Sequence, residues 1–282
     1  MSNRVIKVET DRYTIDKDGK TIVCYAQKKI KRNSDILVGD IVDLEEKNGD
    51  YVVKRVKTRK NSLIRPCIAN VDAIVMTIAP IPEPDYYLVD KMIINCSKQN
   101  IDCIICVNKS DLDGEFCLHV ERQFGSDATV IKTSAKDGDV KELYDAIQGK
   151  FTCFAGQSAV GKSSLLNALV GSTVAISGKL SGNNRGKNTT TRATLYSLGN
   201  DTFIADTPGF GLLEIFSVEY DELDLYYNDY VRVSQNCKYH RCAHIFEPDC
   251  CVKKLVNEGK LSKSRYDRYV NTYNELKNKK KY

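Results

Sequence analysis

Residues 156–163 could hold the phosphate groups of a nucleotide. They read G-Q-S-A-V-G-K-S, which matches the phosphate-loop pattern G-x-x-x-x-G-K-[ST]. The two glycines let the backbone curl so that successive N–H groups point at phosphate oxygens, and the N-terminus of the next helix adds positive charge. We predict nucleotide contacts from the loop and the helix start, namely Gly156, Gln157, Ser158, Ala159, Val160, Gly161, Lys162, Ser163 and Ser164.

Lys162, Ser163 and a later Asp-Thr-Pro-Gly segment could perform phosphoryl-transfer chemistry. Lys162 can reach the β- and γ-phosphate oxygens, and the Ser163 hydroxyl can bind Mg²⁺. Asp206 follows an apolar run at 202–205, where its carboxylate can hold Mg²⁺, often through a water, and the Gly209 N–H can meet the γ-phosphate. Alone, D-x-P-G is an ordinary turn. Downstream of a phosphate loop, a catalytic role is the favoured interpretation.

The stretch 172–192 is polar, glycine-rich and without helical or strand periodicity. A loop of that length inside a compact domain is usually functional. It closes on T-T-T-R at 189–192, where a threonine can complete the Mg²⁺ shell while GTP is bound and release it afterwards. We predict this role for Thr190 or Thr191. The alternative is that the threonines only begin the next strand.

Two segments could read a guanine base. Residues 108–111 read N-K-S-D after an apolar run, and the Asp111 carboxylate there can accept from both N1–H and the exocyclic amine of guanine, which adenine cannot match. Residues 134–136 read S-A-K after the next strand, which aims the Ala135 N–H at O6. We therefore predict a guanine pocket and GTP or GDP as its ligand. The predicted pocket residues are Asn108, Lys109, Asp111, Ser134, Ala135 and Lys136.

The order of these elements is unusual. The N-K-S-D segment lies about fifty residues before the phosphate loop rather than after it. This order leaves the spatial arrangement of the elements unchanged, because each element still follows the carboxyl end of a strand. The sequence therefore predicts a circularly permuted GTPase, in which the D-x-P-G segment leads almost directly into the C-terminal part of the chain.

Phe210 stands where many GTPases carry a glutamine that orients the attacking water. A phenyl ring cannot orient water. We therefore expect slow intrinsic hydrolysis that needs another group or a partner.

Three cysteines and a histidine near the C-terminus have metal-ligand spacing. Cys237, Cys242, His244 and Cys250 would give Zn²⁺ three thiolates and one imidazole, a closed tetrahedral set that is typical of a structural site. His240 and Cys251 are close enough to be rival ligands. The alternative is a cysteine-rich loop without metal.

The elements that must position these residues fall into three groups. Residues 1–62 show five short β-rich runs at 5–8, 12–15, 21–26, 41–45 and 51–56, which favour a small OB-type barrel, with an SH3-like barrel as competitor. Residues 63–218 alternate strands and amphipathic helices, which indicates a parallel α/β sheet covered on both faces. Residues 219–282 are helical around the Cys/His cluster, with a helix expected at 221–233. We predict three domains with these boundaries.

Composition adds further expectations. Both end domains carry an excess of Lys and Arg, whereas the middle one is slightly acidic, so a polyanion held by the flanks and ordinary solvated lysine-rich surfaces are both open. No apolar signal region begins the chain and no run of 18 apolar residues occurs, so we expect a cytoplasmic protein without membrane contact and with reduced cysteines. The C-x-x-C pair of Cys103 and Cys106 lies in an apolar run and is predicted to be strand core.

Together these residues resemble the small ribosomal subunit biogenesis GTPases of the RsgA family, also called YjeQ or YloQ. The segments V-G-D at 38–40 and R-P-x-x-A-N-V-D at 65–72 are similar to that family as well, and the resemblance covers nearly the whole chain. It implies binding to the small ribosomal subunit and its rRNA late in assembly, with GTP hydrolysis stimulated by that subunit. Phe210 fits the family, which has a hydrophobic residue there.

Asn188 departs from the family, because many members have a histidine just before the threonine run. If that histidine assists hydrolysis, catalysis here relies more on the ribosome, on positioning or on a bound cation. We expect a monomer that works as an assembly GTPase. The alternatives are an RNA-binding assembly factor that uses GTP mainly as a structural or switching ligand, and a GTPase that regulates a non-ribosomal partner.

Overall fold

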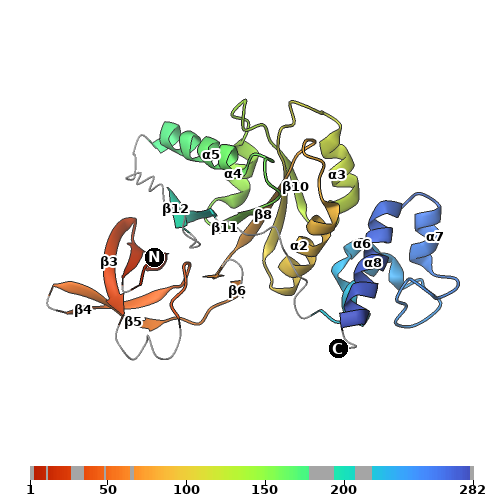
Figure 1. The fold of residues 1–282 in the computed structure, drawn as a ribbon, viewed down its shortest axis with the longest axis horizontal. Helices are drawn as coiled ribbons and strands as arrows, with labels where there is room; N and C mark the ends of the chain where they lie inside the picture. Colours follow the sequence, from red (N-terminus) through yellow and green to blue (C-terminus); the bar gives the residue numbers. More distant parts are fainter. Residues whose placement is uncertain are drawn as a thin grey trace.

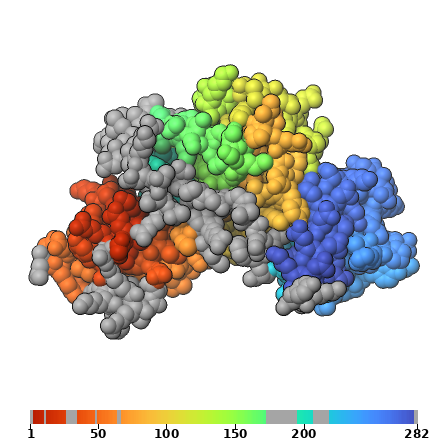
Figure 2. Space-filling view, viewed as in Figure 1, coloured from red at the N-terminus to blue at the C-terminus, as the bar shows by residue number. Residues whose placement is uncertain are grey.

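The computed structural model describes residues 3–10, 12–26, 35–47, 49–63, 67–177, 194–206 and 218–279. Figure 1 shows a β-barrel, a central sheet with helices, and a helical C-terminal body following one another along the long axis. Figure 2 shows the same order in space, with the barrel and the C-terminal helices at opposite ends. Within the described residues, no helix combines the length and apolar character that crossing a membrane requires.

The N-terminal body is a five-stranded barrel of the OB type. The strands pair in the order β1-β2-β3-β5-β4, with β3 and β5 parallel and the other neighbours antiparallel. A bridge from Arg4 to Ile41 joins β1 to the start of β4 and closes the barrel. The parallel pair decides against the SH3-like alternative. The strands are β1 (Arg4–Val8), β2 (Tyr13–Lys17), β3 (Lys20–Ala26), β4 (Val42–Lys47) and β5 (Asp50–Val56).

The central sheet has six strands in the order β10-β9-β8-β11-β13-β12, parallel except for the antiparallel edge strand β12. Their apolar runs are buried on both faces, as a doubly covered sheet requires. The strands are β8 (Ala73–Ile78), β9 (Asp102–Val107), β10 (Thr129–Lys132), β11 (Phe151–Ala155), β12 (Thr194–Gly199) and β13 (Thr202–Asp206).

Helices cover the two faces of this sheet in pairs. Ile74 and Met76 of β8 pack with α2 (Tyr86–Lys98) and α3 (Phe116–Phe124). Ala73 and Val75, which point to the opposite face, pack with α4 (Lys141–Ile147) and α5 (Lys162–Ser177). The alternation of buried residues along one strand therefore supports both layers, and the predicted α/β class is confirmed.

Cys103 and Cys106 are strand core, as predicted. They lie on β9 and face opposite sides of the sheet, because Cys103 packs against the α2 and α3 layer and Cys106 against the α4 and α5 layer. Burial raises the pKa of the Cys106 thiol to about 12. The two thiols therefore cannot act as a paired redox motif.

The C-terminal body contains η1 (Tyr220–Tyr226), α6 (Asn228–Ser234), α7 (Cys251–Asn257) and α8 (Lys263–Lys279). The prediction of one helix over 221–233 is wrong, because a 3₁₀ helix and an α-helix meet at Tyr227, whose backbone is extended (φ −119°, ψ 93°). The Tyr227 side chain is buried, and Asp127 of the central body accepts a hydrogen bond from the Asn228 N–H at 2.6 Å. A tertiary contact thus starts the second helix where periodicity shows no break.

The barrel meets the central sheet through backbone hydrogen bonds. A short strand pair that the sequence did not reveal, β6 (Ser62–Leu63) with β7 (Ile68–Ala69), connects the two bodies. The Ala69 N–H donates to the Val38 carbonyl at 2.9 Å, and the Asn70 N–H donates to the Asn61 carbonyl at 3.0 Å. The guanidinium of Arg4 lies over the ring of Phe151, with its Cζ 5.3 Å from the centroid.

Gly39 lies at the closest approach between the barrel and the central sheet. Its φ of +91° suits glycine, and an added Cβ would lie 2.1 Å from the Ala69 carbonyl oxygen and 2.5 Å from the Phe151 ring. The next residue, Asp40, is fully buried and accepts two hydrogen bonds from Arg59 at 2.7 and 2.8 Å. The V-G-D segment is therefore where the barrel wall touches the sheet.

The C-terminal body is attached by buried ion pairs. Arg265 of α8 is 4% exposed, and it donates to Asp90 of α2 at 3.2 Å and to Asp127 at 2.7 Å. Its Nη1 also donates to the Gln123 carbonyl at 2.7 Å. Arg268 forms a second ion pair with Asp90. Each charge has a partner, which is the condition under which such groups tolerate burial.

We expect Gly39→Ala to lower the free energy of unfolding by about 2 kcal/mol more than Gly49→Ala. Gly49 is the matched control, because it has a similar φ of +85° but nothing within 4 Å of an added Cβ. Both variants carry the backbone cost of a positive φ, so their difference measures the contact with Ala69 and Phe151. Urea unfolding measures this difference. Equal losses of unfolding free energy in the two variants would contradict the close contact between the barrel and the sheet at Gly39.

We expect Arg265→Ala to cost about 3–5 kcal/mol, because it leaves Asp90 and Asp127 buried with fewer partners. Arg232→Ala, which removes an ion pair with Asp229 from a 67% exposed side chain, should cost at most about 1 kcal/mol. Thermal and urea unfolding of the two variants measure the difference. A loss of similar size in both variants would show that the buried pairs do not hold the C-terminal body in place.

Candidate functional site

The predicted nucleotide residues come together at one edge of the central sheet. Strands β9, β8 and β11 are neighbours and parallel, so the loops that follow them share the carboxyl edge. The N-K-S-D segment follows β9 and the phosphate loop follows β11. Because only β8 lies between β9 and β11, the shared edge brings together two segments that the sequence holds about fifty residues apart.

The phosphate loop has a backbone that glycine makes possible. Gly156 has a φ of +136°, and an added Cβ would lie 2.2 Å from the Thr77 carbonyl oxygen. Gly161 has a φ of +98°, and an added Cβ would lie 2.3 Å from Asn108 Nδ2. Ala159 also has a positive φ, +64°. Positive φ angles at these three positions curve the loop into a concave backbone of the kind that binds anions.

Lys162 begins α5 and turns back over the loop. Its Nζ donates to the carbonyl oxygens of Gly156 at 2.9 Å and Gln157 at 2.6 Å. The Gly161 carbonyl accepts from the Leu165 N–H at 2.9 Å, which is the first hydrogen bond of the helix. The ammonium group and the helix N-terminus therefore face the same loop.

Asn108 joins three loops through one side-chain amide. It is 2% exposed, its Nδ2 donates to the Val160 carbonyl at 2.9 Å, and its Oδ1 accepts from the Ala135 N–H at 3.1 Å. The Ala135 N–H, which the sequence reasoning aimed at guanine O6, is thus engaged with Asn108 in this structure. Asn108 has a positioning role that its place in the tetrapeptide did not reveal.

Lys109 connects the N-K-S-D segment to the phosphate loop, and Asp111 connects it to the 134–136 segment. Lys109 Nζ donates to the carbonyls of Ile81 at 2.7 Å and Ala159 at 2.8 Å, so its stem crosses the phosphate loop. The Asp111 carboxylate lies 3.3 Å from Ser134 Oγ and 3.5 Å from Lys136 Nζ. The structure therefore brings the 108–111 and 134–136 segments into contact, as a base pocket requires.

The residues predicted to surround Mg²⁺ are only partly described. Asp206 ends β13, which pairs in parallel with β11, so its backbone lies at the same edge as the phosphate loop. Thr190, Thr191 and Gly209 lie outside the described residues, as do Asn188 and Phe210.

Sequence reasoning missed the segment at 79–85, which lies beside the phosphate loop. Gln157 Oε1 accepts from the Asp85 N–H at 2.9 Å, and Asp85 Oδ1 in turn caps α2 by accepting from the N–H groups of Tyr87 and Leu88. The residues A-P-I-P-E-P-D before a helical run were a recognisable cap signal. Their contact with the loop was not recognisable.

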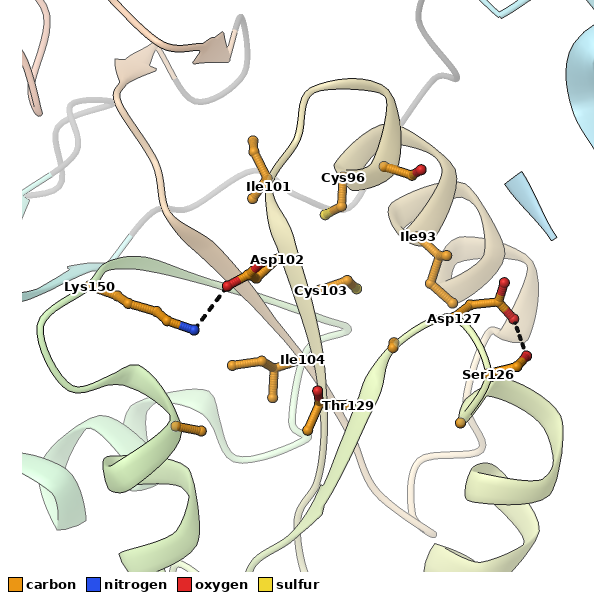
Figure 3. A pocket seen from close by; sticks show the side chains of 14 residues that line it. Ile93, Cys96, Ile101, Asp102, Cys103, Ile104, Ser126, Asp127, Thr129 and Lys150 are labelled. Atoms are coloured by element: carbon orange, nitrogen blue, oxygen red, sulfur yellow. Dashed lines mark hydrogen bonds and ion pairs between the residues drawn. The ribbon is translucent and has the colours of Figure 1, made fainter. Parts of the chain in front are cut away.

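A cavity of about 680 Å³ lies at the other end of the sheet (Figure 3). It is lined by residues at the amino ends of β9 and β10, with Lys150 paired to Asp102 at 2.9 Å. Among the described residues that line it, Lys150 is the only lysine and is paired with a carboxylate, and none belongs to a glycine-rich loop of the kind found at 156–161. The phosphate chemistry belongs to the carboxyl edge.

The predicted zinc ligands form one cluster. The ligand atoms of Cys237, Cys242, His244 and Cys250 all lie within 4.8 Å of one another. His244 Nδ1 is 3.4 Å from Cys250 Sγ and 3.8 Å from Cys237 Sγ. Tetrahedral Zn²⁺ with ordinary bond lengths separates its ligand atoms by about 3.5–3.8 Å, so the four side chains fit this ion.

The rival ligands are not members of the four-residue cluster, although the Cys251 N–H donates to Cys237 Sγ at 3.4 Å. Cys251 Sγ donates to the Asn236 carbonyl at 2.7 Å, and His240 is exposed. Burial lowers the pKa of His244, which favours the neutral imidazole that binds metal. Burial also raises the pKa of Cys242 to about 12, so metal binding must displace thiol protons.

The family model for the RsgA GTPase matches residues 56–216. The chain belongs to the RsgA GTPase family. Two similar curated proteins, both named small ribosomal subunit biogenesis GTPase RsgA, come from Thermotoga petrophila (34% identity, 98% of this chain and 97% of that protein) and Ruminiclostridium cellulolyticum (38%, 84% and 78%).

Solved structures extend the likeness to the whole fold. YjeQ from Thermotoga maritima is 33% identical and covers 97% of both chains with a TM-score of 0.81. YloQ, described as a circularly permuted GTPase, is 31% identical and covers 99% of this chain and 95% of its own, with a TM-score of 0.80. The predicted permutation and the three-part fold class of this RsgA family member are confirmed.

We expect Asp111→Asn to lose at least about 100-fold in affinity for GDP, because the carboxylate that would accept from guanine N1–H and its amine is gone. Affinity for xanthosine diphosphate should rise instead, since xanthine carries a carbonyl where guanine carries the amine. Asp113→Asn is the control, because Asp113 accepts from the Glu115 and Phe116 N–H groups through one oxygen, Oδ1, and the asparagine amide oxygen can accept in the same way. Calorimetry of the two variants with both nucleotides measures this. An unchanged GDP affinity in Asp111→Asn would contradict the base pocket.

Proposed function

We propose that this RsgA family GTPase acts in late assembly of the small ribosomal subunit. It binds the subunit and its rRNA, and hydrolyses GTP to GDP and phosphate when the subunit stimulates it. The observation that carries the proposal is the meeting of a phosphate loop and two base-reading segments at one sheet edge. Its curated relatives are named for small-subunit biogenesis, which supports the choice of partner.

In this proposal the phosphate loop binds GTP and Lys162 stabilises the β- and γ-phosphates. Mg²⁺, when bound, neutralises charge that develops on the transferred group; Ser163 and Asp206 would hold it, with Thr190 or Thr191 completing the shell. The Gly209 N–H meets the γ-phosphate. Asp111 selects guanine, and Asn108 holds the base segments against the phosphate loop.

The flanking domains hold the ribosome in this proposal. Residues 1–62 form the rRNA-binding barrel, 63–218 the GTPase domain and 219–282 the zinc domain. Val23 and Tyr25 on β3 are 56% and 47% exposed, and they lie on the strand pair through which OB barrels bind oligonucleotides. The net positive charge of both flanks supports contact with phosphate backbones.

Zn²⁺ has a structural role here, because all four cluster positions are protein ligands and none is open to substrate. We further propose that the protein works as a monomer in the cytoplasm, where small subunits assemble.

A second candidate is an RNA-binding assembly factor for which GTP is a structural or switching ligand. Phe210 and Asn188 favour it, since neither side chain can activate water. The two functions differ in whether small subunits stimulate turnover.

The deciding experiment measures GTP hydrolysis with purified small subunits, with large subunits as control. We expect strong stimulation by small subunits alone, and a loss of at least about 100-fold in the stimulated rate for Lys162→Ala, which lacks the phosphate-binding ammonium. Lys150→Ala is the matched control, because Lys150 lies in the same domain at the opposite edge of the sheet. A slow rate that neither subunit changes would favour the second candidate.

A further inference from the structure

One nitrogen of the zinc-ligand histidine has no described partner. His244 is fully buried, and its Nδ1 faces the thiols of Cys250 and Cys237. The other ring nitrogen, Nε2, is buried without a hydrogen bond to any part of the chain that the structure describes. The histidine therefore offers Nδ1 to the metal and carries an unsatisfied Nε2.

Binding of a metal at Nδ1 fixes the state of this second nitrogen. A neutral imidazole has one ring proton, so a metal on Nδ1 leaves the proton on Nε2. A buried N–H without an acceptor is costly, because it has lost its hydrogen bonds to water. Histidine ligands of metals therefore almost always donate this N–H to a carboxylate, a carbonyl or a water.

Asp224 of η1 supplies the carboxylate that faces Nε2, with its Oδ2 3.9 Å away. The side chain is 21% exposed, so it is largely withdrawn from solvent. The other nearby carboxylate, Glu247, already accepts from the N–H groups of Ala243, Ile245 and Phe246. Asp224 itself accepts from the backbone N–H groups of Asp224 and Leu225, but among the described residues it is the carboxylate that lies against Nε2.

We propose that Asp224 is the outer partner of the zinc site, whose carboxylate accepts the Nε2–H of metal-bound His244. The hydrogen bond orients the imidazole and makes Nδ1 a better donor to the ion. Asp224 is a positioning residue, because it acts on the metal through His244. The inference rests on the zinc site proposed above.

This contact joins the metal to the interface with the GTPase domain. Leu223, the neighbour of Asp224, is fully buried in the same cluster as Ile94 of α2 and Val252 of α7. η1 is also the first described element after Asp206. Zinc bound at this site would therefore stabilise η1, which packs against α2 of the GTPase domain.

The test measures zinc affinity of the full-length protein by competition with a chromophoric chelator. We expect Asp224→Ala to lose about 10- to 100-fold in affinity, and Asp224→Asn to lose less, because the amide oxygen still accepts a hydrogen bond. Asp221→Ala is the matched control. Asp221 lies on η1 but is exposed, so its removal should leave the affinity unchanged.

A second measurement separates this role from a general structural one. The Co²⁺-loaded variants should keep the absorption bands of a tetrahedral three-sulfur, one-nitrogen site, and their GDP affinity should match the wild type. Zinc affinities of both Asp224 variants within twofold of Asp221→Ala would overturn the inference, as would a wild-type protein that binds no zinc. Neither readout uses hydrolysis, so the result is independent of the proposed GTPase role.

Discussion

The parallel pairing of β9, β8 and β11 is the constraint on which the rest of the site depends. It sets the loop after β9 and the loop after β11 at one edge, and the buried amide of Asn108 then bonds to both sides of the junction. Because Gly161 leaves no room for a side chain beside Asn108, the close approach of the phosphate loop to the base-reading segment requires glycine at this position. Circular permutation changes where the chain enters the domain and leaves this contact intact.

Helix α2 connects that edge with the far end of the molecule. Its N-terminal cap, Asp85, is bonded to Gln157 of the phosphate loop, and one turn further on Asp90 forms ion pairs with Arg265 and Arg268 of α8. The C-terminal body is therefore attached to an element that also touches the nucleotide loops. The route through the chain after Asp206 is thus not the sole physical link between the two.

The central domain has two interfaces, one with the barrel and one with the C-terminal body, and different kinds of contact hold them together. The barrel is attached through backbone hydrogen bonds and a close approach at Gly39, which tolerate little change of shape. The C-terminal body is attached through buried charges, where removing one partner costs far more than the pair contributes. The barrel contacts Phe151 at the amino end of β11, away from the nucleotide loops at the carboxyl edge.

The spacing of residues along the sequence was enough to predict much of the fold and of the candidate site. The glycines of the phosphate loop, the Cys/His cluster and the strand–helix alternation could be read from sequence, because each depends on residues near one another in the chain. The tertiary structure alone decided the break at Tyr227, the Gln157–Asp85 contact and the burial of Arg265 against Asp90. The last pair is separated by 175 residues, and such contacts depend on which surfaces exclude water together once the sheet has formed. No periodicity or motif within one segment carries that information.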